Sequence, residues 1–167
     1  MAPTEKSDLV RLPEIFFFSQ DIFENVSHFI RPGKTEGEIA AFMQGKVKDA
    51  GLELAWDVKT CPSVFSGPDT AGAHYHPTAR RAAEGHILNM DFGVRVGGYC
   101  SDLQRTFYIL RRGERVAPAE VQKGFNTIVT SIEMARKALM PGVKGHEIDS
   151  VAQNYIVSQG YAEFPHG

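Results

Sequence analysis

The sequence lacks the features that would mark a specialised class of protein. Its two cysteines, Cys61 and Cys100, are too few for a disulfide framework or a zinc motif, and they favour a reducing, cytoplasmic compartment. No apolar run approaches the length that spans a membrane, and the apolar segment at residues 15–18 lacks the cleavage site of a signal peptide. The 18 basic residues are balanced by 20 acidic ones, so nucleic acid is not an expected partner.

Much of the sequence consists of amphipathic segments that proline and glycine separate, and we expect these segments to form helices. Its 167 residues suffice for one domain with a buried core. Residues 1–14 are expected to form a polar tail or linker. Apolar spacing then predicts helices over residues 19–30, 35–50, 118–139 and 147–158. Thr35 and Glu38 have the capping-box spacing, which indicates that the second of these helices begins there.

The two helix pairs repeat each other with an offset of 109 residues. Pro32-Gly33 recurs as Pro141-Gly142, Glu38-Ile39 as Glu147-Ile148, and Gly51 as Gly160. Because the breaks and the glycines keep one register, we interpret the chain as part of a fold with two related halves, although chance agreement between two amphipathic helix pairs is the alternative. Strands follow the first pair, whereas the chain ends where strands would follow the second.

Between the helix pairs, residues 87–110 are predicted to form a β-hairpin that carries two aspartates. Glycine supplies the tight turn, and a turn centred on Val96-Gly97 would place Asp91 directly opposite Asp102. Facing carboxylates repel unless one is protonated or a cation lies between them, and manganese or magnesium prefers such oxygen ligands. The pair therefore indicates half of a metal site. The alternative is two ordinary polar residues near a turn, which a shift of one residue in register would favour.

These residues resemble the pita-bread metallopeptidases, which include methionine aminopeptidase, Xaa-Pro dipeptidase, aminopeptidase P and creatinase. The resemblance runs from about residue 15 to the end of the chain. Its most specific part is the hairpin, with Asp91-Phe92-Gly93, Gly98-Tyr99 and residues 101–106. Residues 66–68, His74-Tyr75 and the Pro-Gly breaks match as well and support it. The resemblance implies an α+β pita-bread fold. Residues 15–112 would be its first half, and residues 113–167 the helical start of its second, pseudo-symmetric half.

The resemblance also implies a site. In this family two aspartates, one histidine and two glutamates bind a pair of divalent metal ions, often manganese or cobalt. By motif match, Asp91 and Asp102 would be metal ligands and His74 the catalytic histidine on the substrate side. His166 would be the first, catalytic histidine of a His-Gly-x-x-His motif. The chain ends before the other three ligands, so we expect a C-terminally truncated fragment that is weakly active or inactive.

The function implied is that of a metal-dependent exopeptidase of the Xaa-Pro dipeptidase or aminopeptidase P type, in which a metal-activated water attacks the peptide bond next to proline. Two alternatives remain open: a non-catalytic pita-bread module that binds peptide or protein, and a creatinase-like hydrolase of another C–N bond. The expected partners are a peptide substrate and further copies of the chain in a homo-oligomer, without nucleic acid or membrane. The chain alone is expected to fold poorly or to self-associate, because apolar helix faces would remain uncovered.

Overall fold

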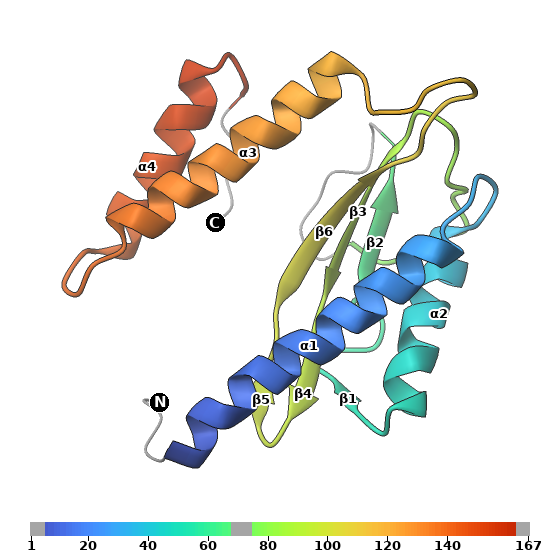
Figure 1. Ribbon diagram of the computed structural model, residues 1–167, viewed down its shortest axis with the longest axis horizontal. Helices are drawn as coiled ribbons and strands as arrows, with labels where there is room; N and C mark the ends of the chain where they lie inside the picture. The colour runs from blue at the N-terminus through green and yellow to red at the C-terminus, as the bar shows by residue number, and fades with distance from the viewer. Residues whose placement is uncertain (1–5, 68–74, 163–167) are drawn as a thin grey trace. The chain divides into compact units, whose positions relative to one another are not determined.

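The computed structural model describes residues 6–67 and 75–162, with side chains from Pro13 onward (Figure 1). The chain divides into two compact units, Met1–Glu114 and Arg115–Gly167. The first unit contains α1 (Lys6–Phe29), α2 (Glu36–Asp49), β1 (Glu53–Leu54), β2 (Ser63–Ser66), β3 (Ile87–Phe92), β4 (Val94–Val96), β5 (Tyr99–Cys100) and β6 (Leu103–Tyr108). The second contains α3 (Ala119–Ala138) and α4 (Gly145–Ser158). None of the helices within the described ranges has the length and apolar character needed to cross a membrane.

Helix α1 begins earlier than the sequence predicts. The expectation of a polar tail over residues 1–14 is wrong from Lys6 onward, because the helix already includes Lys6 and continues through Pro13. An interior proline removes one N–H donor and crowds the carbonyl four residues earlier, yet the helix continues through Pro13. Ser19 and Ile15 are buried one and two turns before Ile22 on the same side, so the buried stripe of α1 extends ahead of the predicted start.

Helix α2 confirms the predicted capping box. The Thr35 hydroxyl accepts a hydrogen bond from the Glu38 amide at 3.0 Å, and the Glu38 carboxylate accepts one from the Thr35 amide at 2.8 Å. Each side chain thereby satisfies an amide that the helix itself leaves without a partner. After the helix, Gly51 takes a φ of 67°, the left-handed conformation in which a chain commonly leaves a helix.

The strands form two antiparallel sheets, ordered β2-β3-β6 and β1-β4-β5, and one long hairpin passes through both. The predicted hairpin is confirmed, but its predicted register is wrong. Val96 pairs with Tyr99, so Gly97 and Gly98 form the turn, and Asp91 lies opposite Gln104 instead of Asp102. The physical reason is the turn: both central residues have positive φ, 59° and 86°, which glycine adopts freely and Val96 would resist. Moving the turn centre by one residue shifts every cross-strand pair by two.

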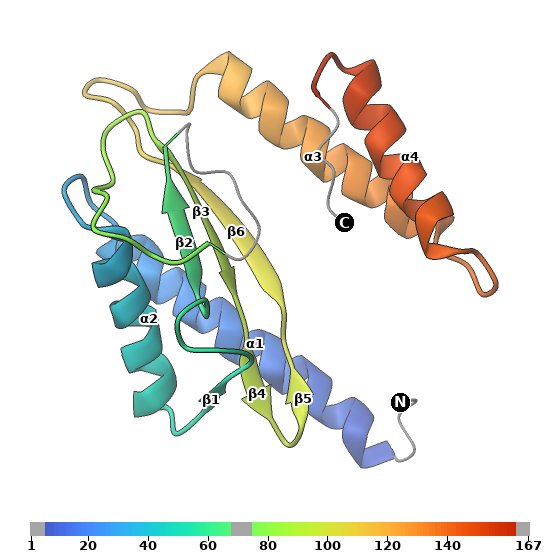
Figure 2. The same ribbon diagram turned by 180° about the vertical axis from the view of Figure 1, so that it is seen from behind.

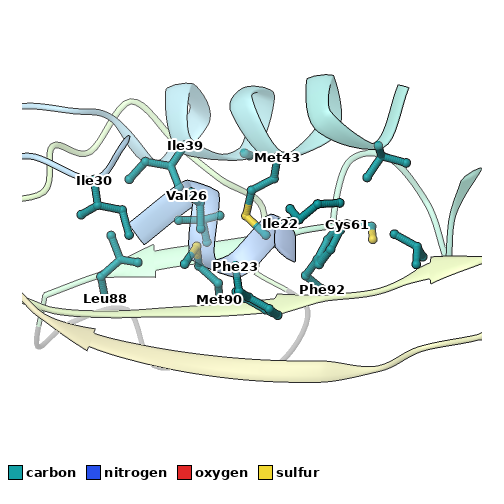
Figure 3. Close-up of a cluster of buried hydrophobic side chains, with 14 of the residues drawn as sticks. Ile22, Phe23, Val26, Ile30, Ile39, Met43, Cys61, Leu88, Met90 and Phe92 are labelled. Atoms are coloured by element: carbon teal, nitrogen blue, oxygen red, sulfur yellow. The ribbon is translucent and has the colours of Figure 1, made fainter. Parts of the chain in front are cut away.

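The hydrophobic core lies between the first two helices and one face of the β2-β3-β6 sheet (Figure 3). Leu88, Met90 and Phe92 occupy alternate positions along β3 and point into this core. There the rings of Phe23 and Phe92 meet edge-to-face, with their centroids 5.7 Å apart. The opposite side of the sheet, here called the open face, is seen in Figure 2. By the strand register it carries Ser63, Phe65, Ile87, Asn89, Asp91, Gln104, Thr106 and Tyr108.

In the second unit α3 and α4 pack against each other. The glycines of the two Pro-Gly breaks, Gly33 and Gly142, have nearly equal φ values of 92° and 91°. Gly51 and Gly160, which follow the second helix of each pair, both have positive φ as well. The predicted repeat of helix, break, helix and glycine stop is therefore confirmed in the backbone.

Candidate metal site on the open face

Asp91 lies in the middle strand of the β2-β3-β6 sheet, between Ser63 on β2 and Gln104 on β6. Its side chain is half-buried, whereas Asp102 is exposed. Asp102 precedes Gln104 by two residues and lies directly before β6, which begins at Leu103. If the alternation of the pleated strand continued to Asp102, the two carboxylates would occupy diagonal positions on the open face. Such neighbours are about 7–8 Å apart at their Cα atoms, within reach of a shared ligand.

Gly93 lies between the two aspartates in the structure as well as in the sequence. It continues the register opposite Asp102, and a Cβ placed on it would collide with the Ser101 carbonyl oxygen, so no other residue fits this crossing. The Gly93 carbonyl accepts hydrogen bonds from the Ala55 amide at 3.0 Å and from the Cys61 thiol at 3.3 Å. The Asp-Phe-Gly segment is thus fixed from both sides.

Cys61 is the residue next to this site whose chemistry could compete for a metal ion. Burial raises the pKa of the Cys61 thiol, hydrogen bonding with the backbone at Gly93 partly opposes that shift, and the negative charge of Asp91 adds to it. Since only the thiolate is a good metal ligand, Cys61 remains a neutral thiol that supports the Gly93 carbonyl.

The donor chemistry of the open face suits a hard divalent cation, but its donor number is small. Asp91 and Asp102 offer carboxylate oxygens, which manganese and magnesium prefer. Within residues 6–67 and 75–162, no three His, Cys, Asp or Glu side chains gather closely enough to hold a metal ion. The two predicted catalytic histidines, His74 and His166, lie outside the described residues. Within the described part of the chain, Asp91 and Asp102 are therefore candidate ligands without a third such side chain beside them.

Glu36 is a structural residue of this region that the sequence analysis missed. Its buried carboxylate accepts hydrogen bonds from the Ser66 amide at 2.8 Å, the Thr78 amide at 3.0 Å and the Thr78 hydroxyl at 2.6 Å. It therefore ties the end of β2 to the chain that returns after His74. A signal was available, because helical spacing puts Glu36 on the same buried stripe as Ile39 and Met43.

Comparisons with known proteins find similarity to peptidases. The model of metallopeptidase family M24 matches residues 18–167. An uncharacterized peptidase of Staphylococcus aureus strain MSSA476 is 31% identical over 140 residues, which are 83% of this chain and 37% of that peptidase. The chain thus spans well under half the length of this relative.

Solved structures give the same result for the fold. The X-Pro aminopeptidase from Thermotoga maritima MSB8 superposes with a TM-score of 0.83 at 30% identity, over 96% of this chain and 44% of that one. The Xaa-Pro dipeptidase from Bacillus anthracis superposes with a TM-score of 0.83 at 26% identity, over 97% and 44% of the two chains. The predicted α+β pita-bread fold is confirmed, with a first half and the helical start of the second.

Proposed function

The chain belongs to metallopeptidase family M24, and from this premise we propose that it supplies Asp91 and Asp102 to the metal site of an exopeptidase that cleaves peptides next to proline. The observation that supports the proposal is the hairpin register, in which Asp91 pairs with Gln104, two residues from Asp102. The Xaa-Pro specificity is supported by the X-Pro aminopeptidase and the Xaa-Pro dipeptidase to which the chain is similar.

Each proposed residue has a separate task. Asp91 and Asp102 bind divalent metal, with manganese or cobalt as the proposed ions. When bound, two such ions supply a water of lowered pKa that can act as a nucleophile near neutral pH. His74 contacts the substrate and His166 assists proton transfer, a role that suits an imidazole because it titrates near neutral pH. The proposed setting is a homo-oligomer in the cytoplasm that acts on peptides, without nucleic acid or membrane.

The test is hydrolysis of Xaa-Pro peptides by the full-length protein with and without manganese. Asp91→Asn and Asp102→Asn remove one ligand charge each with little change in volume. The rate should fall by more than about 100-fold, the upper end of what loss of a residue that only orients a metal ligand costs. Asp49→Asn, at the exposed end of α2, is the matched control and should leave the rate unchanged. Turnover that needs neither metal nor either aspartate would reject the proposal.

A second candidate is a pita-bread module that binds peptides without cleaving them. It is favoured by one observation, the lack of a third metal-ligating side chain beside the aspartates within the described residues. Calorimetry with Xaa-Pro peptides separates the two functions. A binding module should bind peptide equally well with and without manganese and should release no cleaved product, whereas a peptidase should require the metal and consume the peptide.

A further inference from the structure

Two buried serines join α1 to the hairpin next to the proposed metal ligand. The Oγ atoms of Ser19 on α1 and Ser101 lie 2.6 Å apart, and both residues are buried. Ser101 directly precedes Asp102, and these two residues lie between β5 and β6 without belonging to either strand. The contact therefore reaches the chain between the two strands, where the Ser101 amide donates to the Val94 carbonyl at 2.9 Å.

Each of the two serine hydroxyls has a backbone acceptor besides the other serine, so the bond between them is compatible with either direction. Ser19 Oγ lies 3.1 Å from the Ile15 carbonyl, and Ser101 Oγ lies 3.5 Å from the Val94 carbonyl. Ser101 Oγ also accepts from the Val94 amide at 2.9 Å. A chain of hydrogen bonds thus connects Val94 through Ser101 and Ser19 to α1. Such chains polarise their members and hold them more firmly than isolated bonds do.

Ser19 occupies a position where an apolar residue would be expected. It lies on the core-facing stripe of α1 with Ile15 and Ile22, and the equivalent position in the second helix pair, 109 residues later, is Ile128. Burying a hydroxyl is unfavourable unless it is hydrogen-bonded, and an apolar side chain would add to the core instead. The hydroxyl at this position instead provides the hydrogen bond to Ser101.

We propose that Ser19 and Ser101 are positioning residues for Asp102, and this inference rests on the proposed function because Asp102 must bind metal for its position to matter. The backbone hydrogen bond to Val94 holds the Ser101 main chain, and the hydroxyl chain connects the Ser101 side chain to α1. The backbone of Asp102 is thereby fixed relative to Asp91 before any ion arrives. Metal sites lose affinity when the groups that orient their ligands are removed.

The test measures the Mn²⁺ dissociation constant of the chain by water proton relaxation. Ser19→Ala and Ser101→Ala should each weaken binding by about tenfold, the lower end of what loss of a ligand-orienting group costs. The double variant should bind no more weakly than either single one, because both substitutions break the same link. Ser131→Ala is the matched control. This buried helical serine donates to the Ile128 carbonyl of its own helix at 2.8 Å, and its loss should leave the affinity unchanged.

Metal affinity, unlike a melting temperature, is insensitive to a modest loss of stability as long as the protein remains folded. Fluorescence of Trp56, the single tryptophan, verifies the folded state of each variant. If Ser19→Ala does not fold, Ser101→Ala decides by the same criterion. Unchanged affinity in the serine variants, together with weakened binding by Asp102→Asn, would overturn the inference and leave the proposed function intact. Unchanged binding by Asp102→Asn would instead overturn both.

Discussion

The two helix pairs have the same sequence pattern, but their equivalent apolar side chains differ in exposure. Phe23 on α1 is 4% exposed, while its counterpart 109 residues later, Ile132 on α3, is 59% exposed. Ile30 and Leu139 differ in the same way, at 9% and 65%. The first pair packs on a sheet of its own unit, and the second unit contains two helices without strands among its described residues. An apolar stripe therefore indicates that a helix needs a packing partner. Its side chains are buried in the pair whose own unit contains a sheet.

Within the second pair, the contact between the helices uses the other side of α3. Thr127 and Ser131 are the buried residues of α3, and their hydroxyls donate to carbonyls of their own helix. The apolar residues Phe125, Ile128 and Ile132 are all exposed. Exposed apolar patches of this kind promote association, so we expect the chain to self-associate through α3.

The largest expected difference between the two pairs lies in their apolar stripes. Phe23→Ala removes an aromatic ring that contacts Phe92 in the core, and it should destabilise the first unit by about 3–5 kcal/mol. Ile132→Ala, at the equivalent position of α3, should change stability by no more than about 0.5 kcal/mol, as exposed substitutions do. Urea unfolding followed by Trp56 fluorescence and by circular dichroism measures both. Equal losses in the two variants would break the comparison.

The second largest expected effect concerns the first residues of α2 and α4, the second helix of each pair. Position 36 is a buried glutamate in α2, and its counterpart in α4 is Gly145. Glu36→Gln replaces one acceptor oxygen by a donor that faces the N–H groups of Ser66 or Thr78, and it should cost about 2 kcal/mol.

Hydrogen exchange at the Ser66 and Thr78 amides measures the local effect of Glu36→Gln, and both amides should exchange faster. Glu38→Gln is the control, since Glu38 lies on the same helix turn but binds the Thr35 amide instead. Equal protection of Ser66 and Thr78 in wild type and Glu36→Gln would show that the buried carboxylate does not hold these segments.

The N-caps of α2 and α4 also differ, and substitutions at these caps should change stability by a smaller amount. Thr35 caps α2 with its hydroxyl, whereas Lys144 at the start of α4 offers only its backbone amide, which donates to Glu147 at 2.9 Å. Thr35→Ala should destabilise by about 1 kcal/mol, and Lys144→Thr should stabilise by a similar or smaller amount. Thermal unfolding of the single variants measures both, and a destabilising Lys144→Thr would contradict the equivalence of the two starts.

The smallest effect concerns pH. The hydrogen bond from the Thr35 amide, followed by that from Lys34, lowers the pKa of Glu38 below its usual 4.5. A carboxyl whose folded pKa is lowered stabilises the fold above its unfolded pKa, and this contribution is lost as the pH falls through the folded pKa. Wild type should therefore exceed Glu38→Gln in melting temperature at pH 7, and the gap should close in the acid range below pH 4.5. A gap that persists at low pH would contradict this assignment.

Local patterns predict much of this fold because they are encoded within a few residues. The capping box at Thr35, the Gly97-Gly98 hairpin and the 109-residue repeat are all of this kind. The register of Asp91 was missed because it depends on which two residues of the turn adopt positive φ.

Contacts between distant segments could not be predicted from local patterns. Ser19 and Ser101 are 82 residues apart, and Glu36 meets Thr78 from 42 residues away. Neither pairing has a sequence signature, since each depends on how the helices pack over the sheet. The start of α1 at Lys6 likewise runs against the local pattern, because proline is unfavourable inside a helix.

The joint action of Asp91 and Asp102 on a divalent ion is tested most directly by an NMR titration of the chain with Mn²⁺. Paramagnetic broadening should appear first at the backbone amides of both aspartates and of Gly93 between them. It should be lost at all three in Asp91→Asn and in Asp102→Asn, and should persist in Asp49→Asn. Broadening that stays at one aspartate after the other is substituted would contradict a shared site.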